Sequence, residues 1–120
     1  MVIGKQYVTT EFDADIDNTV TLLLDGPGNF RGFHLENPNA ADVYLQVFNA
    51  RKTTDVTLGT TAPVRVYEIV AGGSRDENPE TGIDEHFSTG ICYAITTTSN
   101  GSTDPTSGAK GYFQYKQLGY

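Results

Sequence analysis

The chain has 120 residues, of which 38% are hydrophobic and 11% aromatic, which suits one domain with its own core and excludes a disordered chain. The 8 basic and 15 acidic residues give a formal net charge of −7, which repels phosphate backbones and anionic membranes. Neither direct contact with nucleic acid nor contact with a membrane is therefore expected.

The residue types favour β-structure along the whole chain. Val, Ile, Thr, Tyr and Phe are abundant, and apolar segments recur about every ten residues between turn-forming residues. We predict an all-β fold, a single domain over residues 1–120 built as an antiparallel jelly roll or related β-sandwich of about eight strands. The predicted strands span residues 5–11, 19–25, 30–36, 42–49, 63–70, 82–88, 90–98 and 111–117.

An acidic segment separates the first two predicted strands. Asp13, Asp15 and Asp17 resemble the start of a calcium-binding EF-hand loop, but Asn18 stands where glycine is needed and Leu24 where glutamate is needed. The pattern favours a solvated acidic turn, with a weak calcium site as the alternative.

The fourth predicted strand carries apolar residues on both faces. Val43, Leu45 and Val47 alternate with Tyr44 and Phe48, and this β-branched and aromatic content favours a strand over the helix that the spacing also fits. In a lone two-layer sandwich one of these faces is exposed, so the pattern predicts an interface with another chain.

An adjacent basic pair, Arg51 and Lys52, follows this strand and suits either an exposed turn or contact with an acidic partner. Together with Tyr44 and Phe48, the pair forms the predicted subunit or capsid interface.

No segment combines the residues that catalysis needs. His34 and His86 are far apart in the sequence and lack the His-x-His pair of metal-dependent cupins, the enzymatic jelly rolls. Asp84 and His86 are expected on the solvent-facing side of an edge strand, and Cys92 is expected as a buried, inert thiol. We therefore expect no enzymatic activity, no cofactor and no required metal.

Three segments resemble a family of small virion proteins of tailed bacteriophages. They are NPNAADVYLQVFN at residues 37–49, LGTTAPV at 58–64 and GIDEHFSTGICYAIT at 82–96. The resemblance covers about residues 35–98, and the acidic insertion at 75–80 departs from the family's shorter form.

This resemblance implies a capsid cement or decoration protein. Such a protein is a homotrimer that binds the major capsid protein on the outer capsid surface, between capsomers, and stabilises the DNA-filled head after assembly in the host cytoplasm. The alternative is a tail, fibre or head-fibre module that binds host surface glycans. Tyr7, Tyr67, Tyr112 and Tyr120 are the candidates for stacking on sugars.

Overall fold

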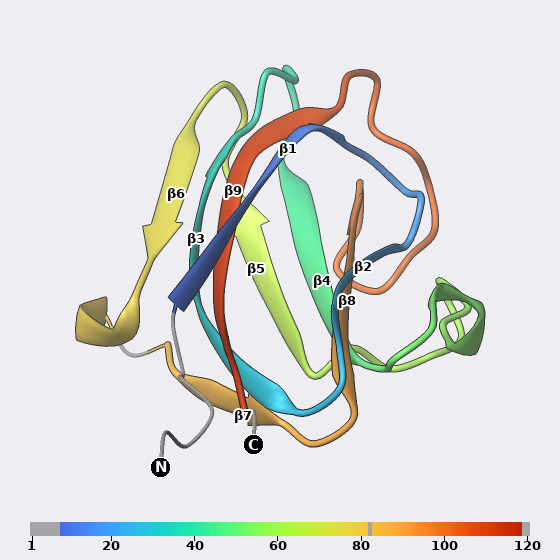
Figure 1. The fold of residues 1–120 in the computed structure, drawn as a ribbon. Coiled ribbons are helices and arrows are strands. Elements are labelled where there is room, and N and C mark those ends of the chain that lie inside the picture. The colour runs from blue at the N-terminus through green and yellow to red at the C-terminus, as the bar shows by residue number, and fades with distance from the viewer. Residues whose placement is uncertain (1–7, 82, 119–120) are drawn as a thin grey trace, which may run out of the picture.

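The computed structural model describes residues 8–81 and 83–118, which form two antiparallel sheets packed face to face (Figure 1). Sheet A has the strand order β1-β9-β3-β6, with short β7 also paired to β3, and sheet B has the order β2-β8-β4-β5. The strands are β1 (Val8–Ile16), β2 (Thr21–Asp25), β3 (Gly28–Glu36), β4 (Val43–Asn49), β5 (Arg65–Ile69), β6 (Ser74–Glu77), β7 (Glu85–Phe87), β8 (Gly90–Thr96) and β9 (Ala109–Gln117). Two 3₁₀ turns, η1 (Thr53–Asp55) and η2 (Pro79–Thr81), lie in connections.

The strand order confirms the predicted jelly roll. When β7 is set aside, the remaining eight strands have the orders 1-8-3-6 and 2-7-4-5, the pattern of two interlocked Greek keys. Each of the eight predicted strands overlaps an observed strand. In the described part of the chain, no helix is both long enough and apolar enough to cross a membrane.

Two differences from the prediction occur at edge strands of sheet A. β6 was not predicted, because its residues Ser-Arg-Asp-Glu are polar and none is buried, so no apolar alternation marks it. β1 continues to Ile16, beyond the predicted end at residue 11, and positions 5–7 of that prediction lie outside the described residues. An edge strand can carry charged side chains, as β6 does, whereas a run of polar residues in the sequence is typical of a turn.

The core lies between the sheets and is centred on phenylalanines of sheet A. The Phe30 ring is 6.2 Å from the rings of Phe33 and Phe87 and 6.4 Å from that of Phe113, measured between centroids. Tyr93 of sheet B stacks at 4.1 Å on Phe113 and so joins the two sheets. Aromatic contacts of this kind add to the free energy gained by burying the rings.

A second apolar cluster covers part of the outer face of sheet B. Phe48 is only 1% exposed, because Val56 and Leu58, from the connection after β4, pack over this face of the strand. Gln46, on the same face, is buried and donates to the hydroxyl of Thr96 at 2.7 Å. The expectation that Phe48 lies on an exposed interface is therefore wrong: the chain's own loops cover it.

This covering predicts that Phe48 stabilises the isolated protein. We expect Phe48→Ala to lower the free energy of unfolding by about 3–5 kcal/mol, because it leaves a cavity beneath the loop. Urea unfolding measures the change. The matched control is Phe12→Ala, since Phe12 is 69% exposed, and we expect it to change stability by less than about 0.5 kcal/mol. Equal effects of the two substitutions would contradict the loop packing.

Candidate functional site

Two buried asparagines hold the end of the sandwich where β3 passes to β4. The Asn37 side-chain nitrogen donates to the carbonyl oxygens of Ile69 and Val70, at 3.0 and 3.1 Å. The Asn37 side-chain oxygen accepts from the backbone and side-chain nitrogens of Asn39, both at 2.9 Å. Asn39 in turn exchanges two hydrogen bonds of 2.8 Å with the backbone of Ser107. The loops that follow β3, follow β5 and precede β9 are thus tied together.

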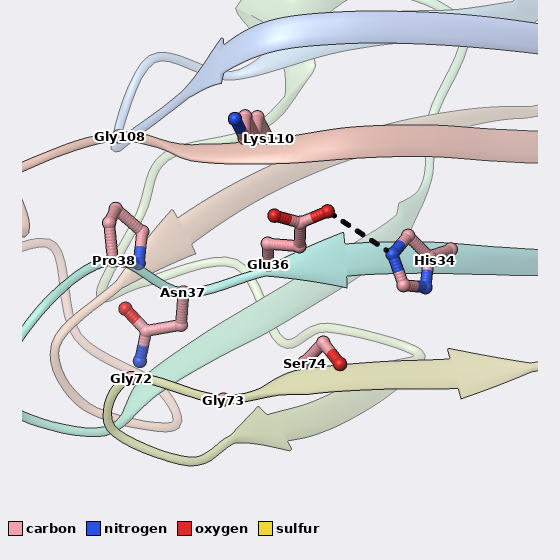
Figure 2. A pocket seen from close by; sticks show the side chains of 9 residues that line it. All are labelled: His34, Glu36, Asn37, Pro38, Gly72, Gly73, Ser74, Gly108 and Lys110. Carbon is pink, nitrogen blue, oxygen red and sulfur yellow. Dashed lines mark ion pairs between the residues drawn. The ribbon is translucent and has the colours of Figure 1, made fainter.

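A surface hollow of about 740 Å³ lies beside these loops. Across three neighbouring strands, Glu36 pairs in register with Lys110 on one side and Ser74 on the other (Figure 2). The lining residues are His34, Glu36, Asn37, Pro38, Gly72, Gly73, Ser74, Gly108 and Lys110. The hollow therefore combines an ammonium, a carboxylate, a hydroxyl and an imidazole with a largely side-chain-free floor.

Next to the hollow, one transverse row of side chains crosses the outer face of β1, β9, β3 and β6 in sheet A. Phe12 pairs in register with Tyr112, Tyr112 with His34, and His34 with Asp76. The rings of His34 and Tyr112 lie 5.6 Å apart between centroids. Phe12 is 69% exposed and Tyr112 is 37% exposed. We call Phe12, Tyr112, His34 and Asp76 the aromatic row.

His34 belongs to the aromatic row and also lines the hollow. Its short contact with Asp76 is the main electrostatic interaction within the row. His34 Nδ1 lies 2.6 Å from Asp76 Oδ1. On the other side of the ring, Nε2 lies 3.5 Å from Glu36 Oε2, the pair that Figure 2 shows. The hydrogen bond to Asp76 raises the pKa of His34 above 6.5, and the charges of Asp76 and Glu36 act in the same direction, against partial desolvation. The imidazole thus holds both carboxylates in defined positions.

Two glycines make this geometry possible. Gly111 has a φ of +155°, and a Cβ there would overlap the carbonyl oxygen of His34, so only glycine lets β9 approach β3 this closely. Gly72 has a φ of +66° in the turn before β6, a conformation that glycine adopts without strain. These residues place Tyr112 against His34 and keep the hollow open.

The predicted interface residues do not come together. Tyr44 is half-buried near the start of β4, and its hydroxyl donates to Glu68 at 3.2 Å. Arg51 and Lys52 are exposed beyond the other end of that strand, about 20 Å away along its length, and Arg51 pairs with Asp25 at 3.2 Å. Tyr44 and the basic pair therefore belong to different surfaces.

A different apolar surface lies at the edge of sheet B. Val64, Val66 and Val70 lie along and beside edge strand β5, with Glu68 between the last two, and all three valines are exposed, Val70 by 54%. They share a face with Tyr44, because Tyr44 of β4 pairs in register with Glu68 of β5, and Glu68 is on the same face of β5 as the valines. We call the three valines the valine strip.

The acidic residues of the possible calcium loop lie in or next to β1 and have other partners. Asp13 accepts a 2.7 Å hydrogen bond from the hydroxyl of Tyr93 and another from the backbone nitrogen of Asp15. Asp17 accepts from the backbone nitrogen of Thr19 at 2.8 Å. Within residues 8–81 and 83–118, no three His, Cys, Asp or Glu side chains are placed to hold a metal ion together.

The other candidates from the sequence are also placed. Cys92 is fully buried, as predicted, and burial raises its pKa to about 11. His86 is exposed on β7, beside Asn29 at 3.2 Å. Tyr67 packs inward, its ring 5.0 Å from that of Phe33, whereas Tyr112 is exposed on the aromatic row. Tyr7 and Tyr120 lie outside the described residues.

The fold and these surfaces define a single-domain jelly-roll β-sandwich with three separate exposed surfaces: the aromatic row, the valine strip and the basic pair. Comparisons with family models, with curated proteins and with solved structures find no match for this chain. Function is therefore inferred from the surfaces themselves.

The pair of His34 with Asp76 predicts a pH dependence. Because the folded-state pKa of His34 is raised, its contribution to stability is complete below about pH 6.5 and is lost as the pH rises through that folded-state pKa. An NMR titration of the imidazole should give a pKa above 6.5 in the native chain and a lower value in Asp76→Asn. An unchanged titration curve in Asp76→Asn would contradict this pairing.

Proposed function

We propose that the chain is a structural protein of a tailed-phage virion, a capsid cement or decoration protein that binds the major capsid protein on the outer capsid surface. The resemblance over residues 35–98 supports this role. The observation that carries it is the valine strip, because apolar side chains exposed along a sheet edge are typical of an interface with another chain.

The valine strip is the proposed contact between copies of the chain. Three copies close a ring when the strip of each contacts a different surface of the next, so we propose a homotrimer. A trimer presents three identical capsid-binding surfaces. Multivalent attachment then converts modest single contacts into strong overall binding.

The exposed pair Arg51 and Lys52 is the proposed contact with the capsid. It lies at the end of the sandwich opposite the Asn37 loops and is the only adjacent pair of basic residues in a chain with a net charge of −7. Such a pair suits an acidic site on the shell. A protein that binds only the assembled shell stabilises it by about 2.7 kcal/mol per site at a hundredfold excess over its dissociation constant.

This role predicts heat protection of DNA-filled heads. Virions stripped of the protein should release DNA at a lower temperature than intact virions, and added protein should restore the original temperature. Arg51→Glu combined with Lys52→Glu should weaken the restoration, whereas Lys110→Glu, at the opposite end, should not. DNA release is followed by the fluorescence of an intercalating dye. Unchanged release, or equal binding to unassembled capsid subunits, would contradict a cement role and favour a tail or fibre location.

The valine strip also predicts the oligomeric state. Light scattering should give the mass of three chains for the native protein and a smaller mass for Val66→Lys combined with Val70→Lys, because the added charges oppose burial of the strip. Phe12→Lys is the matched control, since Phe12 is more exposed than either valine and lies on sheet A. A native monomer at micromolar concentration, or dissociation of Phe12→Lys alone, would overturn this assignment.

A further inference from the structure

We propose that the outer face of sheet A binds an uncharged oligosaccharide, which lies along the aromatic row and enters the adjoining hollow. This binding is separate from the capsid contact proposed above and does not depend on it. It uses the opposite face of the molecule from the valine strip.

The aromatic row supplies the stacking surface. Phe12 and Tyr112 are exposed, pair in register across neighbouring strands, and are continued by the His34 ring. Side chains stand roughly perpendicular to a sheet, so the rings of Phe12 and Tyr112, continued by the His34 imidazole, form an aromatic ridge between polar neighbours. The row from Phe12 to Asp76 crosses three inter-strand spacings, about 14 Å, which suits several sugar rings rather than one.

The polar groups beside the ridge match a ligand rich in hydroxyls. Asp76 and Glu36 are acceptors held by His34, and Lys110 and Ser74 supply donors on the two strands that flank Glu36. A small number of polar groups that converge on a hollow is typical of small-ligand sites. Donors and acceptors alternate here two residues along the strands from the rings, on the same face of the sheet, as a polyhydroxylated ligand requires.

The site is formed before any ligand arrives. Asn37 is buried and hydrogen-bonded to the chain at the end of β5. The backbone of Gly72, Gly73 and Gly108 lines the hollow, and a Cβ at Gly73 or Gly108 would meet Val70 or Asp15, so the chain packs closely there. The Asp76–His34 pair joins β6 to β3, so the polar wall does not have to assemble on binding. Such preorganisation lowers the entropy cost of binding a flexible chain.

Charge selects the class of saccharide. The hollow holds one carboxylate with one ammonium and the His34 imidazole, Asp76 lies next to it, and the whole chain carries a net charge of −7. Sulfated, phosphorylated and uronic-acid polymers, like nucleic acids, are repelled by this field. A protein partner is less well matched than a sugar, because polar side chains interrupt the apolar surface on both sides of the rings.

The experiment titrates the full chain, labelled with ¹⁵N, with hexasaccharides of glucose, mannose, xylose and N-acetylglucosamine. At least one should shift backbone resonances of β1, β9, β3 and β6 while leaving the valine strip unchanged. Tyr112→Ala should weaken that binding by about tenfold or more, and Tyr112→Phe should retain it, because the ring and not the hydroxyl makes the contact. Tyr44→Ala is the matched control, since it removes a partly exposed tyrosine from sheet B and should leave the affinity unchanged.

The proposal would be overturned by no shift with any hexasaccharide, by shifts confined to residues outside sheet A, or by equal loss of affinity in Tyr112→Ala and Tyr44→Ala. Stronger binding of heparin than of every neutral sugar would also overturn it, because it reverses the charge argument. Thermal unfolding of each variant checks that the fold is intact, and since no capsid is present, a negative result leaves the cement role unaffected.

Discussion

The buried amide of Asn37 is the constraint on which the loop end of this jelly roll depends. Its nitrogen and oxygen are both bonded, to the chain after β5 and to Asn39, and Asn39 extends the same network to Ser107 before β9. A buried amide that loses its partners costs about 1–3 kcal/mol, so each bond restricts the loops to one arrangement. This hydrogen-bond network fixes the loops that border the hollow beside Glu36 and that lead into β6.

Sheet B shows why apolar residues on both faces of a strand do not by themselves indicate a partner chain. Phe48 and Cys92 form an outer cluster under Val56, supplied by the long connection between β4 and β5. The connection acts as a partial third layer and removes these side chains from water. What stays exposed is the sheet edge, where Val66 and Val70 have no such cover. The exposed apolar surface therefore lies at the edge of sheet B and not at Phe48, where the sequence pattern predicted it.

The sequence predicted the fold well, because alternation along strands such as β4 and β8 records burial directly. It did not predict β6, whose Asp76 completes the aromatic row, since an edge strand with no buried residue lacks that alternation. The row itself depends on pairing between strands, and register shifts near Gly32 in β3 and after Asp13 in β1 decide which residues face each other. Individual residues such as His34 and Tyr112 were visible in the sequence, but their adjacency was not.

The three surfaces lie on different parts of one rigid framework. The valine strip borders sheet B, Arg51 and Lys52 lie at the end away from the Asn37 loops, and the aromatic row crosses the outer face of sheet A. The contact between Tyr93 and Phe113 holds the two sheets together in one close-packed core. Binding at one surface therefore does not have to deform another. A copy bound to a shell as we propose would keep the aromatic row free, so the proposed capsid attachment and the proposed saccharide binding are compatible in the same molecule.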